Sequence, residues 1–223
     1  MGLSDDLKGE VGQIFKEQWN ATDGYVVPDP EDIGHGNEAR KLVGAVLYSD
    51  LIDSTGMVNE YGEKFCAEVY KAFLRCASKI ITKNKGDITA FDGDRIMAVF
   101  LGLSKEINAV NAAKQIEGAI IKIINPAIKF QYPKTLFVAN QVCGIDTSSL
   151  FVARTGYRTS NDLVWVGKAA NFAAKLSQIR EPLKSTWITE EVFNYLNEQP
   201  SNWVKATYHN RTVYSSTYYR DLE

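Results

Sequence analysis

The sequence predicts an α+β sandwich in which helices cover one face of an antiparallel sheet, and three observations support this. Short apolar runs typical of strands alternate along the chain with amphipathic stretches of helical periodicity. The turn sequence Asp92-Gly93-Asp94 separates two of the strand candidates, as in a β-hairpin. The resulting order, β-α-β-β-α-β with further elements appended, is that of a ferredoxin-like fold.

The composition is that of an ordinary globular domain and argues against several classes of function. The 223 residues include 25 Lys+Arg and 27 Asp+Glu, a net charge of −2, which disfavours nucleic-acid binding as the main activity. No apolar stretch is long enough for a membrane span, and the acidic N-terminus is unlike a signal peptide. Three cysteines have neither metal-binding spacing nor the even number of a disulfide framework. We therefore expect a cytoplasmic protein without nucleic-acid or membrane partners.

The N-terminal segment differs in pattern from the rest of the chain. Leu3 to Trp19 has apolar residues near helical spacing, which predicts an amphipathic helix. From Asn20 to Asn37, prolines and glycines predict a loop. We therefore divide the chain into an N-terminal helix and loop, residues 1–38, and a compact domain, residues 39–223.

The compact domain is expected to alternate strands and helices. Its second helix is expected to begin after Ser104 and to stop at Asn125-Pro126. The remaining helices are predicted at residues 60–84, 167–179 and 190–197, and strands at 41–49, 87–91, 95–101, 136–146, 150–154, 203–208 and 213–219.

Two aspartates stand at positions where chemistry is expected. Asp50 ends the first strand of the domain, and Asp94 lies in the hairpin turn. In a β-α-β-β unit the first strand lies beside the hairpin, so these carboxylates are expected to face each other. Two divalent cations held by shared carboxylates form the standard clamp for nucleotidyl transfer, and Mg²⁺ completes its shell with phosphate oxygens and water. The alternative is that both aspartates only cap turns; their occurrence as a pair favours the metal site.

Two further groups of residues suit a nucleotide. The turn after Asp50 opens a helix and offers backbone N–H groups and the hydroxyls of Ser54 and Thr55 to a triphosphate. Asn171 and Lys175 are four residues apart and share one helical face, where they suit a sugar ring and a phosphate. By spacing alone, an ordinary solvated helix face explains this last pair at least as well.

Three segments together resemble the catalytic domain of class III nucleotidyl cyclases. They are residues 46–55, 91–100 and 166–176, which match an aromatic-x-Asp-Ile-x-x-x-Thr segment, a Gly-Asp hairpin followed by an apolar strand, and Gly-x-x-x-Asn-x-Ala-x-Arg. The resemblance covers roughly residues 42–196, with the motifs in the family's order.

The resemblance implies a role for each matching residue at the metal and triphosphate sites. Asp50 and Asp94 match the aspartates that bind two divalent cations, Mn²⁺ or Mg²⁺. Leu51 matches the position whose backbone carbonyl also binds metal, while Ser54 and Thr55 fall in the turn that holds the triphosphate.

The resemblance also implies a head-to-tail homodimer with composite sites. Asn171 matches the asparagine that orients the ribose and stabilises the transition state, and it would act on the partner's metal aspartates. Lys175 stands where the family usually has an arginine on the triphosphate. Lysine keeps the charge but loses the bidentate fork of arginine.

The base-reading positions depart from the purine-specific pattern. Ala90 and Val164 stand where purine cyclases have polar groups, so hydrogen-bonded readout of a purine is absent. Tyr48 precedes the first metal aspartate by two residues, where an aromatic ring would narrow the pocket and favour a pyrimidine; it is otherwise an ordinary strand residue. Residues 161–167 and the hairpin are similar to the stand-alone pyrimidine cyclases of bacterial Pycsar anti-phage systems.

The resemblance therefore implies synthesis of 3′,5′-cyclic UMP and pyrophosphate from UTP. In such systems the product is a second messenger of anti-phage defence that activates a separate effector protein. The alternatives are a cytidylate cyclase acting on CTP, then an adenylate or guanylate cyclase, then a non-catalytic nucleotide-binding module. A diguanylate cyclase is disfavoured because its Gly-Gly-Asp/Glu-Glu-Phe signature is absent.

Overall fold

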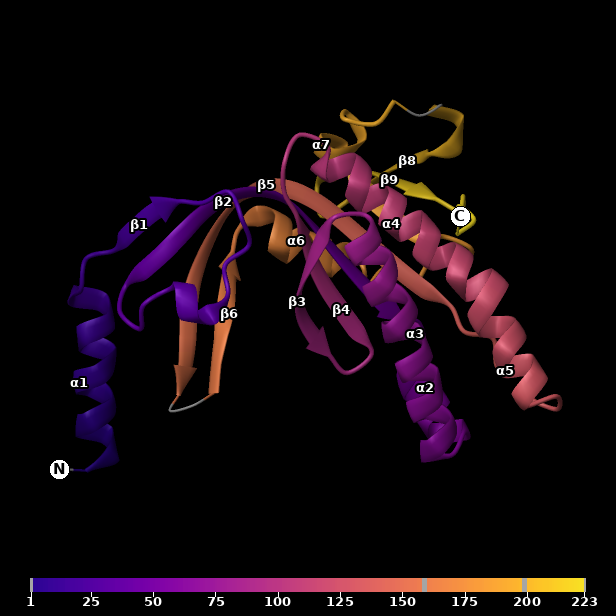
Figure 1. Ribbon diagram of the computed structural model, residues 1–223, viewed down its shortest axis with the longest axis horizontal. Coiled ribbons are helices and arrows are strands. Elements are labelled where there is room, and N and C mark those ends of the chain that lie inside the picture. Colours follow the sequence, from indigo (N-terminus) through magenta and orange to yellow (C-terminus); the bar gives the residue numbers. More distant parts are fainter. Residues whose placement is uncertain (1, 158–159, 198–199, 223) are drawn as a thin grey trace.

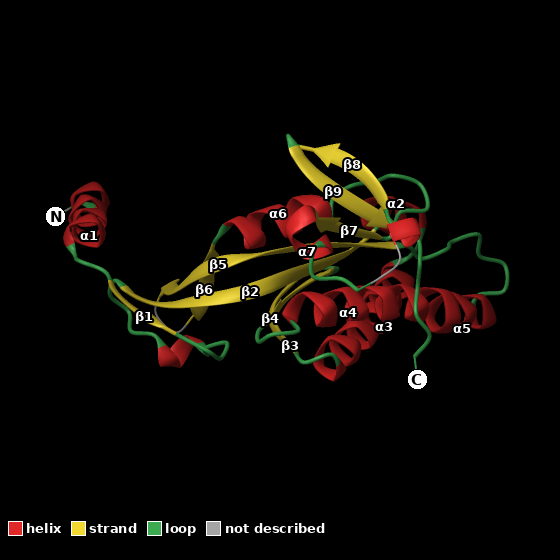
Figure 2. Ribbon diagram, turned by 90° about the horizontal axis from the view of Figure 1, so that it is seen from above, coloured by secondary structure: helices red, strands yellow, loops and turns green. Residues whose placement is uncertain are grey.

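A single mixed sheet runs through the molecule and carries helices on both faces (Figures 1 and 2). The structure is a computed structural model that describes residues 2–157, 160–197 and 200–222. Within these residues the strand order is β3-β4-β2-β5-β7-β9-β8, with β1 added to β2 and β6 added to β5. The strands are β1 (Asn20–Asp23), β2 (Glu38–Leu51), β3 (Gly86–Asp92), β4 (Arg95–Phe100), β5 (Gln141–Tyr157), β6 (Ser160–Val166), β7 (Thr186–Thr189), β8 (Val204–Tyr208) and β9 (Arg211–Ser216).

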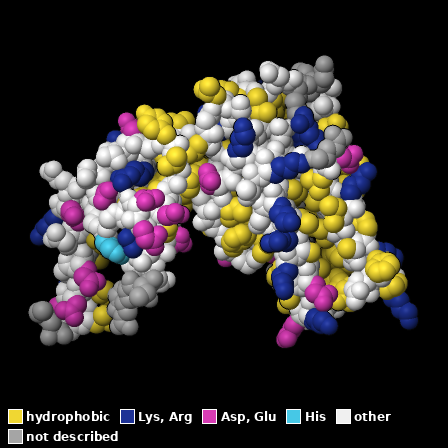
Figure 3. All heavy atoms as spheres, viewed as in Figure 1, with side chains coloured by type: hydrophobic (Ala, Val, Ile, Leu, Met, Phe, Trp, Pro, Cys, Tyr) yellow, Lys and Arg dark blue, Asp and Glu magenta, His cyan; other side chains and the backbone are white. Residues whose placement is uncertain are grey.

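The described residues form seven α-helices. They are α1 (Leu3–Lys16), α2 (Ser54–Glu60), α3 (Glu63–Lys83), α4 (Lys105–Ala119), α5 (Asn125–Gln131), α6 (Lys168–Leu176) and α7 (Glu190–Phe193). In Figures 1 and 3 the molecule has the outline of an arch. One limb holds α1 and β6, and the other holds α2, α3 and α5.

The core is divided between the two faces of the sheet. Because side chains alternate along a strand, Leu47 of β2 packs in the cluster that includes α3 and α4, whereas Val46 packs with Ala169 and Ala173 of α6. The α+β class is confirmed, but two details of the prediction are wrong. The helices cover both faces, and the sheet is mixed, since β1 is parallel to β2 and β5 is parallel to β7.

The predicted pair of strands at residues 136–146 and 150–154 is one continuous strand, β5. The polar run Asp146-Thr147-Ser148-Ser149 indicated a break, but its hydrogen-bonding groups find partners within the fold. Asp146 is fully buried and accepts from the Thr189 hydroxyl at 2.7 Å and from Arg211 Nη1 at 2.9 Å. Residues 160–166, for which no strand was predicted, form β6.

The helical boundaries differ from the prediction at two places. The expected helix over residues 60–84 is α3, which begins at Glu63, and the separate helix α2 precedes it. The predicted stop at Asn125-Pro126 is wrong, because the helical segment continues from α4 through a π-helix, Ile120–Ile124, into α5. Pro126 lies in the first turn of α5, where the missing N–H of proline is tolerated.

The N-terminal segment is partly joined to the sheet. The predicted helix is confirmed as α1, none of whose residues is buried. The predicted loop at 20–37 contains β1, which pairs with the start of β2 from Asn20↔Glu38 to Asp23↔Lys41. The sheet therefore begins before residue 39, although the division of the chain at that point remains a prediction. Among the described residues, no helix is both long and apolar enough to cross a membrane.

Candidate active site

The two predicted metal-binding aspartates lie where β2 ends and β4 begins, because these two strands pair there. In this antiparallel ladder Asp50 lies directly opposite Arg95, so Asp94 is one residue beyond the partner of Asp50. Leu51 follows Asp50 at the end of β2 and is buried. The first strand of the domain therefore lies beside the hairpin, as the β-α-β-β order predicted.

The Asp50 carboxylate is buried and surrounded by positive charge. Its side chain is 7% exposed. Its Oδ2 atom accepts from Arg180 Nη2 at 3.0 Å and from Arg95 Nη2 at 3.4 Å. Two guanidinium groups thus offset the cost of burying this carboxylate.

The Asp94 carboxylate has a free acceptor. Its Oδ2 atom is buried and makes no hydrogen bond within the described part of the chain. A buried carboxylate oxygen without a partner costs free energy that a bound cation would recover. The donor set therefore fits a divalent cation held by few protein ligands. No cluster of three or more His, Cys, Asp and Glu able to hold a metal occurs among residues 2–157, 160–197 and 200–222. Phosphate oxygens and water would thus complete the shell.

The turn predicted to hold a triphosphate begins α2. Asp53 has left-handed backbone angles (φ 58°), and its side chain accepts from the backbone N–H of Gly56 at 3.2 Å. Ser54 is half-buried and hydrogen-bonds to the Tyr70 hydroxyl of α3, while Thr55 is exposed. Burial raises the pKa of Tyr70, and the nearby negative charge of Asp94 raises it further. Tyr70 therefore lies between the turn and the hairpin.

Tyr48 lies on the same face of β2 as Asp50. Its ring packs against the α6-side cluster, as do Ala90 and Trp165. Burial raises the pKa of Tyr48, the positive charge of Arg95 lowers it, and Asp92 raises it. Tyr48 and Ala90, two of the three positions singled out for base recognition, thus share one apolar cluster beside the carboxylates. The third, Val164, is 42% exposed on β6.

No hydrogen bond or ion pair joins Asn171 or Lys175 to Asp50 among the described residues, where Arg95 and Arg180 are the partners of that carboxylate. Asn171 and Lys175 are both exposed on α6, whose opposite side packs against the sheet. A Cβ atom at Gly144 of β5 would lie 2.2 Å from the Ala173 carbonyl oxygen, so the second half of α6 touches the sheet closely there. Asn171 and Lys175 thus present their side chains to solvent rather than to a partner within the described part of the chain.

Sequence reasoning missed Arg95, Arg180 and Tyr70. Arg95 follows Asp94 directly, and correct pairing of the predicted strands would have set it opposite Asp50. Arg180 and Tyr70 give no signal in their spacing, because they reach the site only through the packing of α6 and α3.

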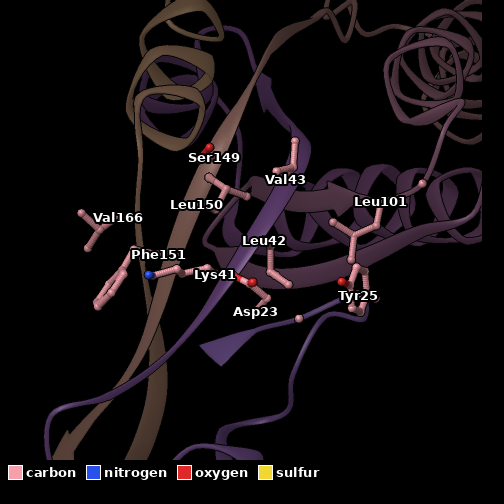
Figure 4. Close-up of a pocket in the computed structure, with 12 residues that line it drawn as sticks. Asp23, Tyr25, Lys41, Leu42, Val43, Leu101, Ser149, Leu150, Phe151 and Val166 are labelled. Atoms are coloured by element: carbon pink, nitrogen blue, oxygen red, sulfur yellow. The ribbon is translucent and has the colours of Figure 1, made fainter. Parts of the chain in front are cut away.

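A cavity of ≈ 650 Å³ lies toward the other end of β2 (Figure 4). Its walls come from β1, β2, β5 and the segments beside them, and include Lys41, Val43 and Phe151. None of the predicted site residues lines it. The candidate active site is therefore defined by the carboxylates and their partners rather than by this cavity.

Comparison with solved structures defines the class of protein. The adenylyl cyclase CyaB from P. aeruginosa superposes with a TM-score of 0.69 at 19% identity, covering 83% of this chain and 100% of that chain. The guanylyl cyclase Cya2 superposes with a TM-score of 0.70 at 15% identity, covering 81% and 94%. The fold is that of a class III nucleotidyl cyclase domain.

Curated relatives identify the family within this class. A uridylate cyclase of Xanthomonas perforans is 43% identical over 228 residues, which cover 98% of each chain. A uridylate cyclase of Burkholderia cepacia is 49% identical over 201 residues, covering 89% of this chain and 86% of the relative. The chain belongs to the uridylate cyclase family. No family model matches it.

Proposed function

We propose that this protein converts UTP to 3′,5′-cyclic UMP and pyrophosphate with the help of Mn²⁺ or Mg²⁺. The observation that carries the proposal is the ladder of β2 with β4, in which Asp50 lies opposite Arg95 and Asp94 is the next residue in the hairpin turn. Membership of the uridylate cyclase family supports the choice of substrate.

In the proposed reaction the 3′-oxygen of the ribose attacks the α-phosphorus in line. The bond from the α-phosphorus to the pyrophosphate oxygen breaks and pyrophosphate leaves, while the 3′-hydroxyl gives up its proton to solvent water. Asp50, Asp94 and the backbone carbonyl of Leu51 would hold the divalent cations. When bound, these cations activate the hydroxyl and neutralise the charge on the phosphates. Ser54, Thr55 and the backbone N–H groups at the start of α2 would position the triphosphate.

We propose that the active enzyme is a head-to-tail homodimer. Asn171 and Lys175 are exposed on α6, which supports a site completed by a second copy. In that dimer the partner's Asn171 would orient the ribose, and the partner's Lys175 would neutralise the triphosphate.

The base pocket supports a pyrimidine. Tyr48 reduces the space beside the metal site, and Ala90 packs in the same apolar cluster without offering a hydrogen bond. CTP is the second candidate substrate, because no residue of this cluster distinguishes uracil from cytosine. ATP and GTP are the next candidate substrates after CTP. A binding module without catalysis is disfavoured, since Asp50, Asp94 and Asn171 are all present.

The test is to incubate the purified protein with each of the four nucleoside triphosphates and Mn²⁺ and to identify the products by mass spectrometry. We expect cyclic UMP from UTP as the main product. Cyclic CMP as the main product would favour the cytidylate alternative, and absence of any cyclic product would contradict cyclase activity.

We further propose that the product acts in the cytoplasm as a second messenger of anti-phage defence and activates a separate effector protein. The similarity of the sequence to Pycsar cyclases supports this role. Cyclic UMP should rise in cells that carry the gene after phage infection, and nucleotide extraction with mass spectrometry measures it. An unchanged level would contradict the role in defence without contradicting the chemistry.

A further inference from the structure

Two arginines occupy the same oxygen of the carboxylate assigned to metal binding. Arg180 Nη2 lies 3.0 Å from Asp50 Oδ2, and Arg95 Nη2 lies 3.4 Å from the same atom. A carboxylate oxygen offers two lone pairs to donors or ligands. A cation that binds Asp50 at Oδ2 therefore competes with a guanidinium group for its position.

The two arginines differ in how firmly the fold holds them. Arg95 is the first residue of β4, lies across the ladder from Asp50, and has a side chain that is 26% exposed. Arg180 follows α6 in a segment without regular structure, and its side chain is 39% exposed. Its Nη1 atom donates to the carbonyl oxygens of Ser177 at 2.7 Å and Ile179 at 3.4 Å. Arg180 is thus the arginine that can leave Asp50 with less disturbance of the sheet.

A second arginine–aspartate pair in the molecule shows the contrast with a permanent contact. Asp146 is 0% exposed, and Arg211 Nη1 lies 2.9 Å from its Oδ2 atom. The guanidinium of Arg211 also lies 4.2 Å from the centre of the Phe172 ring, and Thr189 donates to the same carboxylate. Arg211 is fixed by a ring and by two strands, whereas Arg180 is fixed by the end of one helix and by Asp50.

We propose that Arg180 is a displaceable counter-ion of the active site. In the free enzyme it neutralises Asp50, and it moves to the substrate's triphosphate when divalent cations take its place. This inference rests on the proposed function. Repulsion between a guanidinium and a divalent cation at one oxygen favours the exchange. The planar fork of arginine matches phosphate oxygens bidentately. Arg180 thereby supplies the bidentate guanidinium contact to the triphosphate that Lys175 cannot make.

The experiment compares Mn²⁺ binding and UTP binding in a set of variants. Mn²⁺ is titrated without nucleotide and followed by calorimetry or electron paramagnetic resonance. The loss of one charge-assisted contact predicts about tenfold tighter Mn²⁺ binding for Arg180→Ala. The same variant should show about a tenfold higher KM for UTP. Arg180→Lys keeps the competing charge, so its Mn²⁺ affinity should stay near wild type while its KM for UTP rises.

Two controls limit the interpretation. Arg75→Ala removes an exposed arginine from α3 and should change neither affinity. Asp50→Asn should abolish the Mn²⁺ site that Arg180→Ala strengthens. Circular dichroism checks that each variant is folded.

Each result decides one part of the proposal. Unchanged or weaker Mn²⁺ binding in Arg180→Ala would overturn the displacement, as would a Mn²⁺ site that survives Asp50→Asn. An unchanged KM for UTP would overturn the transfer to the triphosphate. The Mn²⁺ titration needs no turnover. A wild-type protein that makes no cyclic nucleotide therefore contradicts the proposed function, while the titration still reports whether Arg180 competes.

Discussion

The carboxylates of Asp50 and Asp94 have opposite surroundings. Asp50 is neutralised by two arginines, whereas Asp94 keeps a buried oxygen without a partner among the described residues. The two residues therefore differ in what their removal does to stability, although we expect the same loss of activity from both.

Asp94→Ala should abolish turnover and leave the free energy of unfolding nearly unchanged, because the mutation removes a group whose burial is uncompensated. Asp50→Ala should abolish turnover as well, but with a loss of stability of about 1 kcal/mol, since it leaves two half-exposed guanidinium groups without their partner. Cyclase assays with saturating Mn²⁺ and urea denaturation measure both quantities. Activity above about a tenth of wild type in either variant would contradict the metal assignment.

Tyr48→Ala should raise the use of ATP and GTP relative to UTP. The tyrosine ring occupies the apolar cluster beside the carboxylates, and relief of overpacking of ~1–3 kcal/mol corresponds to ~5–150-fold in relative rate. The ratio of kcat/KM for ATP and UTP, measured in competition, gives the effect. Tyr48→Phe is the matched control and should keep the wild-type ratio, because the ring remains. If Tyr48→Ala leaves the ratio unchanged, the steric explanation is wrong.

Helix α6 carries Asn171 and Lys175 and leads to Arg180, and its position depends on one glycine of β5. A Cβ atom at Gly144 would lie 2.2 Å from the Ala173 carbonyl oxygen and 2.4 Å from the Ser177 backbone nitrogen. Both neighbours are backbone atoms, so neither can move without the helix. Gly144 therefore fixes how closely α6 approaches the sheet, and with it the positions of Asn171, Lys175 and Arg180.

Gly144→Ala should destabilise the protein by ~1–3 kcal/mol, the range for overpacking in a filled core. It should also lower cyclase activity more than the change in stability explains, because α6 must shift. Denaturation and activity assays on the same preparation test this. Gly12→Ala in α1 is the matched control, since its Cβ would meet nothing within 4 Å. Equal stability of the two variants would contradict the close packing of α6.

The secondary-structure elements also show which features can be predicted from the sequence. The strand at Asp50 and the turn at Asp94 are local signals, so the pairing of this strand with the hairpin was predicted correctly. The continuity of β5 was not predicted. Asp146 is tolerated in a buried strand only because Thr189 and Arg211 bind it, and both follow it by more than forty residues. The contact of Arg180 was not predicted for the same reason, because its partner Asp50 is distant in sequence.

At the scale of the whole molecule, the proposed site takes its two halves from two copies of the chain. Asp50 lies at the end of β2, and Asn171 is exposed on the outer side of α6. In the proposed head-to-tail dimer, the Asp50 of one copy acts together with the partner's Asn171, so a single copy has no complete site. The activity of the protein should therefore depend on dimer concentration.

A mixture of Asp50→Ala and Asn171→Ala chains should recover part of the activity that each variant has lost. The mixed dimer contains one intact site and one site with both substitutions. Co-expression with two affinity tags isolates that dimer, and turnover up to about half of wild type is expected. An inactive mixed dimer would show that each site is built within a single chain.

The long ladder between β2 and β5 has a consequence for cooperativity. It joins every residue from Ala39 to Leu51 with a partner between Gln141 and Ala153. These partners meet only after the chain between them has closed a large loop, so the ladder forms slowly and late. Once formed, it has no short segment that opens alone. Its central amides should exchange with deuterium only when the whole domain unfolds, whereas those of α1 should exchange within seconds.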